Sequence, residues 1–293
     1  MVGQIICNIS NLYRVKYGDK YIECTARGKF KNENLKPLVG DKVIFDKEKK
    51  LIIELLPRKN ELLRPPICNI DQALIVMSAK EPNFDLYLLD KMISIINYNN
   101  INTIICITKL DLLSSEEGNK MDEYIKYYQK LGYEVLTNEQ TEKIHSLLKN
   151  KITVLTGQSG VGKSTLLNKL DNNLNLKTSK ISHALGRGKH TTRHVELLET
   201  RNSLIADTPG FSSLDFYNMD KESIRDSIIE FENFKEECKY RDCFHLKEDD
   251  CKIKELVNDG AILKSRYLNY QKFLKEKDDE VDQNIRIRSI KKR

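Results

Sequence analysis

One segment restricts the fold of this chain more than any other: the run Gly157-Gln158-Ser159-Gly160-Val161-Gly162-Lys163-Ser164. It matches the pattern G-x-x-x-x-G-K-[ST], follows the apolar run KITVLT (151–156) and precedes a helical pattern over 163–171. Glycines in such a loop let backbone N–H groups converge on phosphate oxygens, and the helix N-terminus adds a positive dipole end. The sequence therefore predicts a nucleotide-phosphate loop between a parallel strand and a helix. We expect Lys163 to reach the β- and γ-phosphates and Ser164 to bind Mg²⁺, and we expect Thr165 to extend the nucleotide contacts.

A second candidate phosphate element is Asp207-Thr208-Pro209-Gly210, which ends the strand-like run SLIADT and lies 50 residues after Gly157. A carboxylate at a strand end suits Mg²⁺ bound through water, and the N–H of Gly210 is placed to contact a γ-phosphate. Taken alone, the same four residues also make a good turn. Together with the phosphate loop they predict Asp207 and Gly210 as nucleotide and magnesium contacts.

The candidate base-binding element is Thr108-Lys109-Leu110-Asp111, which follows the buried strand pattern NTIICIT (102–108) and is similar to the [NT]-K-x-D guanine signature. An aspartate there accepts two hydrogen bonds that guanine supplies and adenine does not. The element precedes the phosphate loop by 49 residues, whereas ordinary GTPases place it after D-x-x-G. The order predicts a circularly permuted GTP-binding domain, which a parallel sheet tolerates when the old termini are close in space.

Two details of that element depart from the common pattern. Thr108 stands where many GTPases have asparagine, so we expect a weaker brace to the phosphate loop. The loop expected to meet the guanine O6 lies near Leu136-Thr137-Asn138 and lacks the usual Ser-Ala pair.

A fourth element is the pattern Cys238-x4-Cys243-x-His245-x5-Cys251. Three thiolates and one imidazole form a complete tetrahedral set for a structural Zn²⁺ ion, and their softness favours zinc over hard cations. The chain has seven cysteines, an odd number that argues against a fully paired disulfide framework. The sequence predicts one structural zinc ion in a reducing compartment.

Three compositional zones predict a multidomain chain. Residues 1–65 alternate short strand patterns with Gly and Asp turns, which indicates an all-β barrel of the OB type that binds RNA. Residues 66–225 alternate strands and helices, which predicts the central α/β P-loop GTPase domain, and residues 226–293 read as a mostly helical zinc-binding domain. The barrel aromatics can serve either as base-stacking faces or as core, and we expect core for any one of them: Tyr13, Tyr17, Tyr21 and Phe30.

Charge is distributed unevenly along the chain. Residues 1–65 carry 14 basic and 8 acidic side chains, and residues 261–293 carry 10 and 5, so both ends are positive. This pattern favours a polyanionic partner, although lysine-rich surfaces also occur simply for solvation. No apolar run reaches the ~18 residues of a membrane helix, and the first ten residues lack a signal-peptide pattern, so we expect a cytoplasmic protein without membrane contact.

The order of these motifs resembles a known family. T-K-x-D, GQSGVGKST, GRGKHTTR, DTPGF and the cysteine–histidine set, together with the junction over 64–72, are similar to the circularly permuted, small-subunit-dependent GTPases of the RsgA/YjeQ family. The resemblance implies an OB barrel, a permuted G domain and a zinc domain. It also implies GTP hydrolysis to GDP and phosphate, stimulated by the 30S ribosomal subunit and its 16S rRNA, in late maturation of that subunit. We expect a monomer.

The water-positioning group is the least determined part of the site. Ras-like GTPases use a glutamine directly after D-x-x-G, but this chain has Phe211, which cannot hydrogen-bond water. The segment 186–193 lies where a switch loop belongs, so His190 is the candidate to orient water, and the resemblance supports this role. The alternative is that His190 is simply a solvated loop residue. Thr192, in preference to Thr191, is the expected switch ligand of Mg²⁺. The alternative function is a nucleotide-gated RNA-binding module with incidental turnover, and Lys109 with Asp111 disfavours an ATPase or kinase.

Overall fold

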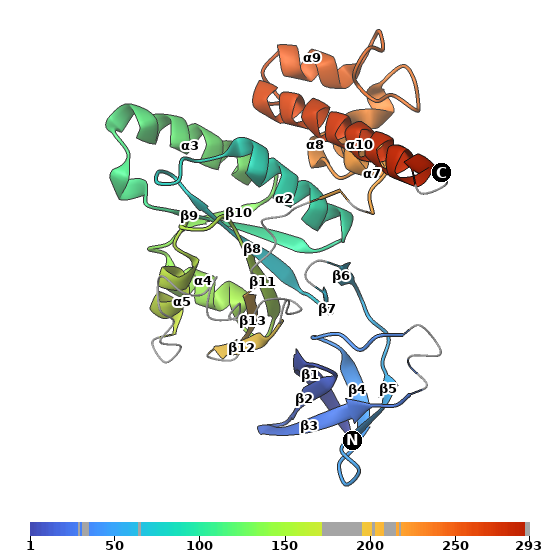
Figure 1. The fold of residues 1–293 in the computed structure, drawn as a ribbon. Helices are drawn as coiled ribbons and strands as arrows, with labels where there is room; N and C mark the ends of the chain where they lie inside the picture. The colour runs from blue at the N-terminus through green and yellow to red at the C-terminus, as the bar shows by residue number, and fades with distance from the viewer. Residues whose placement is uncertain are drawn as a thin grey trace.

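The computed structural model describes residues 1–28, 30, 35–63, 66–171, 195–200, 203–207, 215–216 and 218–290. Figure 1 shows a small barrel near the N-terminus, a central sheet flanked by helices, and a helical unit at the C-terminal end. Within the described residues, no helix is both long enough and apolar enough to cross a membrane.

The barrel is closed and is built from the five strand patterns that the sequence predicts. Its strands follow the order β1-β2-β3-β5-β4 around the barrel, and β1 pairs with both β2 and β4. Val15, Val43 and Ile52 are fully buried inside it. The strands are β1 (Val2–Ile9), β2 (Leu12–Tyr17), β3 (Lys20–Ala26), β4 (Lys42–Asp46) and β5 (Leu51–Leu55).

The aromatic side chains of the barrel divide between core and surface. Tyr13 and Phe30 are buried, and the ring of Tyr17 packs edge-on against Phe45 with 5.3 Å between centroids. Tyr21, by contrast, is 51% exposed. The expectation of core is therefore met for Tyr13 and Phe30 and is wrong for Tyr21.

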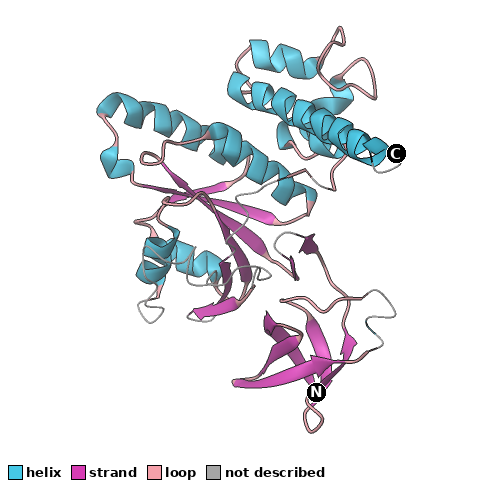
Figure 2. Ribbon diagram, in the orientation of Figure 1, coloured by secondary structure: helices cyan, strands magenta, loops and turns pink. Residues whose placement is uncertain are grey.

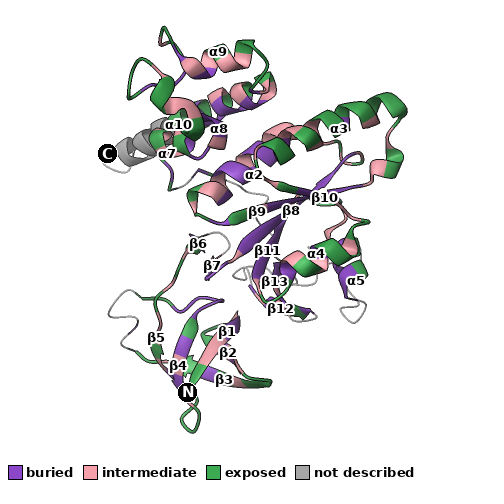
Figure 3. Ribbon diagram, turned by 180° about the vertical axis from the view of Figure 1, so that it is seen from behind, coloured by how far each residue is buried: buried purple, intermediate pink, exposed green. Residues whose placement is uncertain are grey.

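The central sheet has six strands in the order β10-β9-β8-β11-β13-β12. All neighbours are parallel except β12 and β13, which are antiparallel. Every residue of β8 and β11 is buried, as expected for central strands of a sheet covered on both faces (Figure 3). The strands are β8 (Gln72–Ser78), β9 (Asn102–Thr108), β10 (Glu134–Thr137), β11 (Ile152–Thr156), β12 (Leu197–Thr200) and β13 (Ser203–Asp207).

Helices cover both faces of the sheet (Figure 2). Alternate residues of a strand point to opposite faces, so they meet two different helical layers. Ile75 and Met77 share a core with α2 (Leu86–Tyr98) and α3 (Ser115–Lys130), whereas Leu74 and Val76 share a core with the helices on the other face, which are α4 (Thr141–Leu148) and α5 (Lys163–Leu170). A third core belongs to the C-terminal helices. These elements are α7 (Lys221–Asp226), α8 (Ile229–Phe234), η3 (Lys235–Glu237), α9 (Lys252–Asn258) and α10 (Lys264–Ile290).

Helix α3 begins at Ser115, where a capping box precedes it. The Ser114 hydroxyl accepts from the Glu117 N–H, and the Glu117 carboxylate accepts from the Ser114 N–H. Strand β12, which supplies the outer edge of the sheet, was not expected from the sequence.

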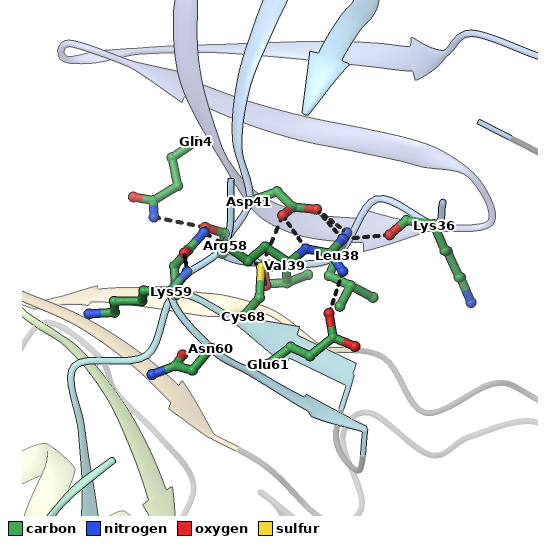
Figure 4. A network of polar contacts seen from close by, with 12 residues as sticks. Gln4, Lys36, Leu38, Val39, Asp41, Arg58, Lys59, Asn60, Glu61 and Cys68 are labelled. Carbon is green, nitrogen blue, oxygen red and sulfur yellow. Dashed lines mark hydrogen bonds and ion pairs between the residues drawn. The ribbon is translucent and has the colours of Figure 1, made fainter. Parts of the chain in front are cut away.

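A short hairpin follows the barrel and is tied to it. Strands β6 (Glu61–Leu63) and β7 (Pro66–Cys68) pair with each other, and Ile67 bridges to Val39 of the barrel. Beside them lies the ion pair between Asp41, which is fully buried, and Arg58 (Figure 4), with nitrogen–oxygen distances of 2.7 and 2.8 Å. The Cys68 thiol also donates to Asp41, at 3.1 Å. The hairpin is therefore fixed to the barrel by buried polar contacts.

Candidate functional site

The phosphate loop lies between β11 and α5, as the sequence predicts. Gly157, Gly160 and Gly162 have φ angles of +141°, +81° and +96°, which other residues rarely adopt. A Cβ atom at Gly157 would stand 2.1 Å from the carbonyl oxygen of Val76, so no side chain fits there. The need for glycine at this position is thus set by the neighbouring strand β8 as well as by the turn.

Lys163 is the first residue of α5, and its side chain folds back over the loop. Its Nζ donates to the carbonyl oxygens of Gly157 and Gln158, each at 2.6 Å. The ammonium group therefore lies at the centre of the loop, where a bound phosphate chain would meet it. Ser164 is half-buried beside it and Thr165 is exposed.

The base-binding element is braced directly onto the phosphate loop. The Thr108 hydroxyl lies at the end of β9 and donates to the carbonyl oxygen of Val161 at 2.6 Å. Thr108 is 3% exposed, so this bond is made away from water. Threonine therefore makes a direct brace at this position, because β9 and the phosphate loop approach each other closely here.

Lys109 adds a second link between the two loops. Its Nζ donates to the carbonyl oxygen of Gly160 at 2.8 Å and to the carbonyl oxygen of Glu81, in the loop that joins β8 to α2. Glu81 had no signal in the sequence, because a backbone carbonyl carries none. Asp111 follows on a short 3-10 turn (Leu110–Leu112) and is exposed, which leaves its carboxylate accessible to a base.

The loop expected to approach the guanine O6 leaves the sheet beside this element. Asn138 donates its backbone N–H to the carbonyl oxygen of Ile107, and the backbone N–H of Thr137 is taken by the Gln140 side chain at 2.9 Å. The segment 138–140 therefore lies next to the end of β9. The N–H of Thr137 is engaged within its own loop.

The second phosphate element reaches the same edge of the sheet. Asp207 is the last residue of β13 and pairs in register with Leu155 of β11, two residues before the phosphate loop. The remaining predicted residues lie outside the described part of the chain: Gly210, His190 and Thr192.

The structure brings the four predicted metal ligands together. The ligand atoms of Cys238, Cys243, His245 and Cys251 all lie within 4.8 Å of one another. His245 Nδ1 is 3.6 Å from the sulfur of Cys238 and 3.4 Å from that of Cys251. A tetrahedral ion with metal–sulfur bonds of ~2.3 Å and metal–nitrogen bonds of ~2.0 Å separates such ligands by ~3.5 Å, so the set could hold one metal ion.

The protonation of these ligands suits a metal as well. Burial lowers the pKa of His245 to about 4, so the imidazole is neutral and has a ring-nitrogen lone pair to offer a metal. Burial raises the pKa of Cys243 to about 12, so a metal must displace the thiol proton. Tyr267 donates its hydroxyl to the His245 carbonyl oxygen at 2.6 Å and so ties α10 to the cluster.

A buried ion-pair network joins helix α2 to the C-terminal helices, and no sequence pattern indicates it. Arg266 of α10 lies between Asp90 of α2 and Glu230 of α8, at 2.6 and 2.7 Å. The three side chains are at most 3% exposed. No spacing rule finds the network, because its members are 36 and 176 residues apart.

These features define a class of protein. A phosphate loop on the central strand, a lysine–aspartate base element braced onto it by Thr108, and a D-x-x-G strand beside it make a P-loop GTPase. The base element precedes the phosphate loop in the chain, so the GTPase domain is circularly permuted.

The comparisons with known proteins agree with this class and identify the family. The RsgA GTPase model matches residues 55–217, the RsgA N-terminal domain model matches residues 2–51, and a model described as 50S ribosome-binding GTPase matches residues 152–285. The chain belongs to the RsgA family and is a GTP hydrolase.

Relatives and solved structures cover nearly the whole chain. The small ribosomal subunit biogenesis GTPase RsgA of Bacillus cereus is 44% identical over 282 residues, which cover 94% of this chain and 96% of the relative. The protein of the same name from Latilactobacillus sakei is 43% identical, with the same coverage. The structure of YloQ, described as a circularly permuted GTPase, has a TM-score of 0.80 at 37% identity over 95% of both chains. That of YjeQ from Thermotoga maritima has a TM-score of 0.81 at 32% identity and covers 94% of this chain and 97% of that one.

Proposed function

We propose that this GTPase binds the small ribosomal subunit and hydrolyses GTP to GDP and phosphate there, in a late step of subunit assembly. The observation that carries the proposal is the Thr108–Val161 hydrogen bond, because it makes the upstream base element and the phosphate loop one nucleotide site. The printed names of the relatives, which are biogenesis GTPases of that subunit, support the choice of partner.

The nucleotide is held by the groups at the carboxyl edge of the sheet. Backbone N–H groups of the loop from Gly157 to Thr165, with the Lys163 ammonium, bind the phosphates, and Asp111 accepts hydrogen bonds from guanine. Magnesium, which GTP hydrolysis in this class uses, would be held by Ser164, Asp207 and Thr192. The N–H of Gly210 contacts the γ-phosphate.

His190 is our candidate for the group that orients the attacking water. Phe211 occupies the position of the glutamine used by Ras-like GTPases, so turnover of the free protein is slow. Docking on the subunit brings His190 to the γ-phosphate and accelerates the reaction.

The remaining parts of the proposal concern metal, domains and setting. The Cys238, Cys243, His245 and Cys251 set holds one structural zinc ion, which the ligand spacing and softness support. We divide the chain into an RNA-binding barrel (1–65), the permuted GTPase domain (66–225) and the zinc-binding domain (226–293). The protein acts as a monomer in the cytoplasm, where 16S rRNA is the polyanion that meets its basic ends.

The test is steady-state phosphate release with and without 30S subunits, at low and moderate salt. We expect strong stimulation of the wild type, loss of most of it in His190→Ala with GTP binding retained, and weak nucleotide binding in Lys163→Ala. Stimulation of His190→Ala equal to that of the wild type would overturn the water-positioning role. A change in GTP affinity on the subunit without any change in rate would favour the nucleotide-gated binding module instead.

A further inference from the structure

The barrel meets the central sheet beside strand β12 through a backbone bridge between Cys7 and Glu196 and through a small set of charged side-chain contacts. Lys16 Nζ lies 2.6 Å from a carboxylate oxygen of Glu199, and the Tyr21 hydroxyl donates to the other oxygen at 2.7 Å. Arg14 pairs with Glu196 at 3.5 Å. We call the five residues of these side-chain contacts the seam. Two glutamates of the GTPase domain thus engage two cations and a tyrosine of the barrel.

The barrel side of the seam has the chemistry of an RNA-binding face. Arginine and lysine neutralise backbone phosphates, and an exposed tyrosine ring stacks on a base. Arg14 is 40% exposed and Lys16 is 30% exposed, so solvent reaches these cations although the glutamates engage them. Tyr21 is the barrel aromatic that the structure places at the surface rather than in the core.

A polar cleft opens beside the seam and brings further lysines near Lys16, among the carboxylates of Asp19 and Asp71. The cleft, of about 840 Å³, lies between the barrel and the amino-terminal edge of the central sheet and includes Glu199 in its lining. Lys16 and Lys42 line it from the barrel, and Lys151 lines it from the start of β11. A phosphodiester chain that reached Lys16 would find further cations alongside.

The glutamate side of the seam belongs to the nucleotide-binding sheet. Leu197 and Glu199 of β12 pair with Ala206 and Leu204 of β13, the strand that ends at Asp207 (Figure 1). Strand β13 in turn pairs with β11, which leads into the phosphate loop. The seam therefore connects the barrel to the strand that carries the second phosphate element.

We propose that Glu196 and Glu199 are built-in competitors of RNA: they occupy Arg14, Lys16 and Tyr21 until an RNA backbone displaces them. The inference rests on the proposed function, because RNA of the small subunit is the polyanion. Half-exposed ion pairs are weak in water, so phosphates can exchange for the carboxylates without unfolding the barrel. Binding of RNA then removes these side-chain ties between the barrel and β12, while the backbone bridge between Cys7 and Glu196 stays, and so links RNA capture to the nucleotide-binding sheet.

The experiment measures the affinity of the full-length protein for poly(U) and for 30S subunits at several salt concentrations. The double variant Glu196→Gln/Glu199→Gln is compared with Glu48→Gln/Glu54→Gln, which removes the same charge from exposed barrel positions away from the seam. We expect the seam variant to bind poly(U) about twofold to thirtyfold more tightly than the control variant, the range for losing two exposed ion pairs. The gain in poly(U) affinity should vanish when Arg14→Gln/Lys16→Gln is also present, because Glu196 and Glu199 then have no cations to compete for. Retained GTP binding verifies the fold of each variant.

The outcomes separate this inference from the proposed function. If the wild type binds neither poly(U) nor 30S subunits, the proposed function fails. If the wild type binds and the seam variant gains no more than the control, or gains equally without Arg14 and Lys16, the competitor role is wrong. A gain with 30S subunits but none with poly(U) or free 16S rRNA would assign the face to a ribosomal protein and overturn the proposal.

Discussion

Replacing Arg266 with alanine is expected to lower the free energy of unfolding by about 3–5 kcal/mol, because two buried carboxylates lose their shared counter-charge. The guanidinium makes two hydrogen bonds to Glu230, at 2.7 and 2.8 Å, and one to Asp90, at 2.6 Å. All three groups are at most 3% exposed, so water cannot solvate the charges left behind.

The surrounding polar groups define a compensating variant. Tyr127 donates its hydroxyl to Glu230 at 2.7 Å, and Asn269 donates to Asp90 at 2.7 Å. When Arg266, Asp90 and Glu230 are all replaced by uncharged side chains, no charge stays buried. The hydroxyl of Tyr127 and the amide of Asn269 still find amide oxygens to donate to. The triple variant Arg266→Met/Asp90→Asn/Glu230→Gln should therefore be clearly more stable than Arg266→Ala.

The assay is urea denaturation followed by circular dichroism. Lys143→Ala is the control, because it breaks the half-exposed pair with Glu134 and should cost less than about 1 kcal/mol. An Arg266→Ala protein within 1 kcal/mol of the wild type would refute the reasoning, as would a triple variant less stable than the single one.

The pH dependence of stability tests the Arg266→Ala prediction a second time. Burial raises the pKa of Glu230, but the charge and hydrogen bonds of Arg266 and the hydroxyl of Tyr127 outweigh it and hold the pKa below its ordinary value of 4.5. The stabilisation from Glu230 is therefore complete above that pH and is lost as the pH falls below it. Without Arg266, burial alone raises the pKa, so the penalty of Arg266→Ala should shrink between pH 7 and pH 4.5. A penalty that grows instead would contradict this account.

Three further predictions concern the nucleotide and the metal. Thr108→Ala should weaken GTP binding roughly fivefold in calorimetry, the value of one hydrogen bond of about 1 kcal/mol, while Thr108→Asn keeps the brace; equal losses in both would argue against it. Asp111→Asn should lose guanine and gain xanthine nucleotides in competition assays, and unchanged GTP affinity would remove Asp111 from the base site. Purified protein should contain about one zinc ion per chain by metal analysis, and Cys243→Ser should lose it and melt at a lower temperature; a metal-free wild type prepared without chelator would exclude a zinc site.

Local pattern was sufficient to predict the elements that carry the nucleotide chemistry. The strand before Gly157 and the helix after Gly162 follow from apolar runs and glycine spacing, and the structure has both. The cysteine–histidine set was equally readable, because the ligand types are diagnostic and closely spaced. The order of the motifs was enough to predict the permutation, since it depends on the chain alone.

The sequence erred where the answer depended on distances between elements. The direct bond from Thr108 to the phosphate loop depends on the close approach of β9 to that loop, which no local pattern shows. Strand β12 is four residues long at the sheet edge, too short for alternation to indicate it. Tyr21 has the same residue type as the buried Tyr13, and only the closure of the barrel sorts one into the core and the other onto the surface.

What the sequence determined by itself is therefore the chemistry and order of the sites, and what only the tertiary structure decided is which distant groups meet. Arg266 and Asp90 are 176 residues apart, and Lys16 and Glu199 are 183 apart. Backbone propensity and periodicity act over a few residues, so they determine elements. Long-range ion pairs form only after the sheet, barrel and helices have packed, because burial and geometry then select one partner from many equivalent charges.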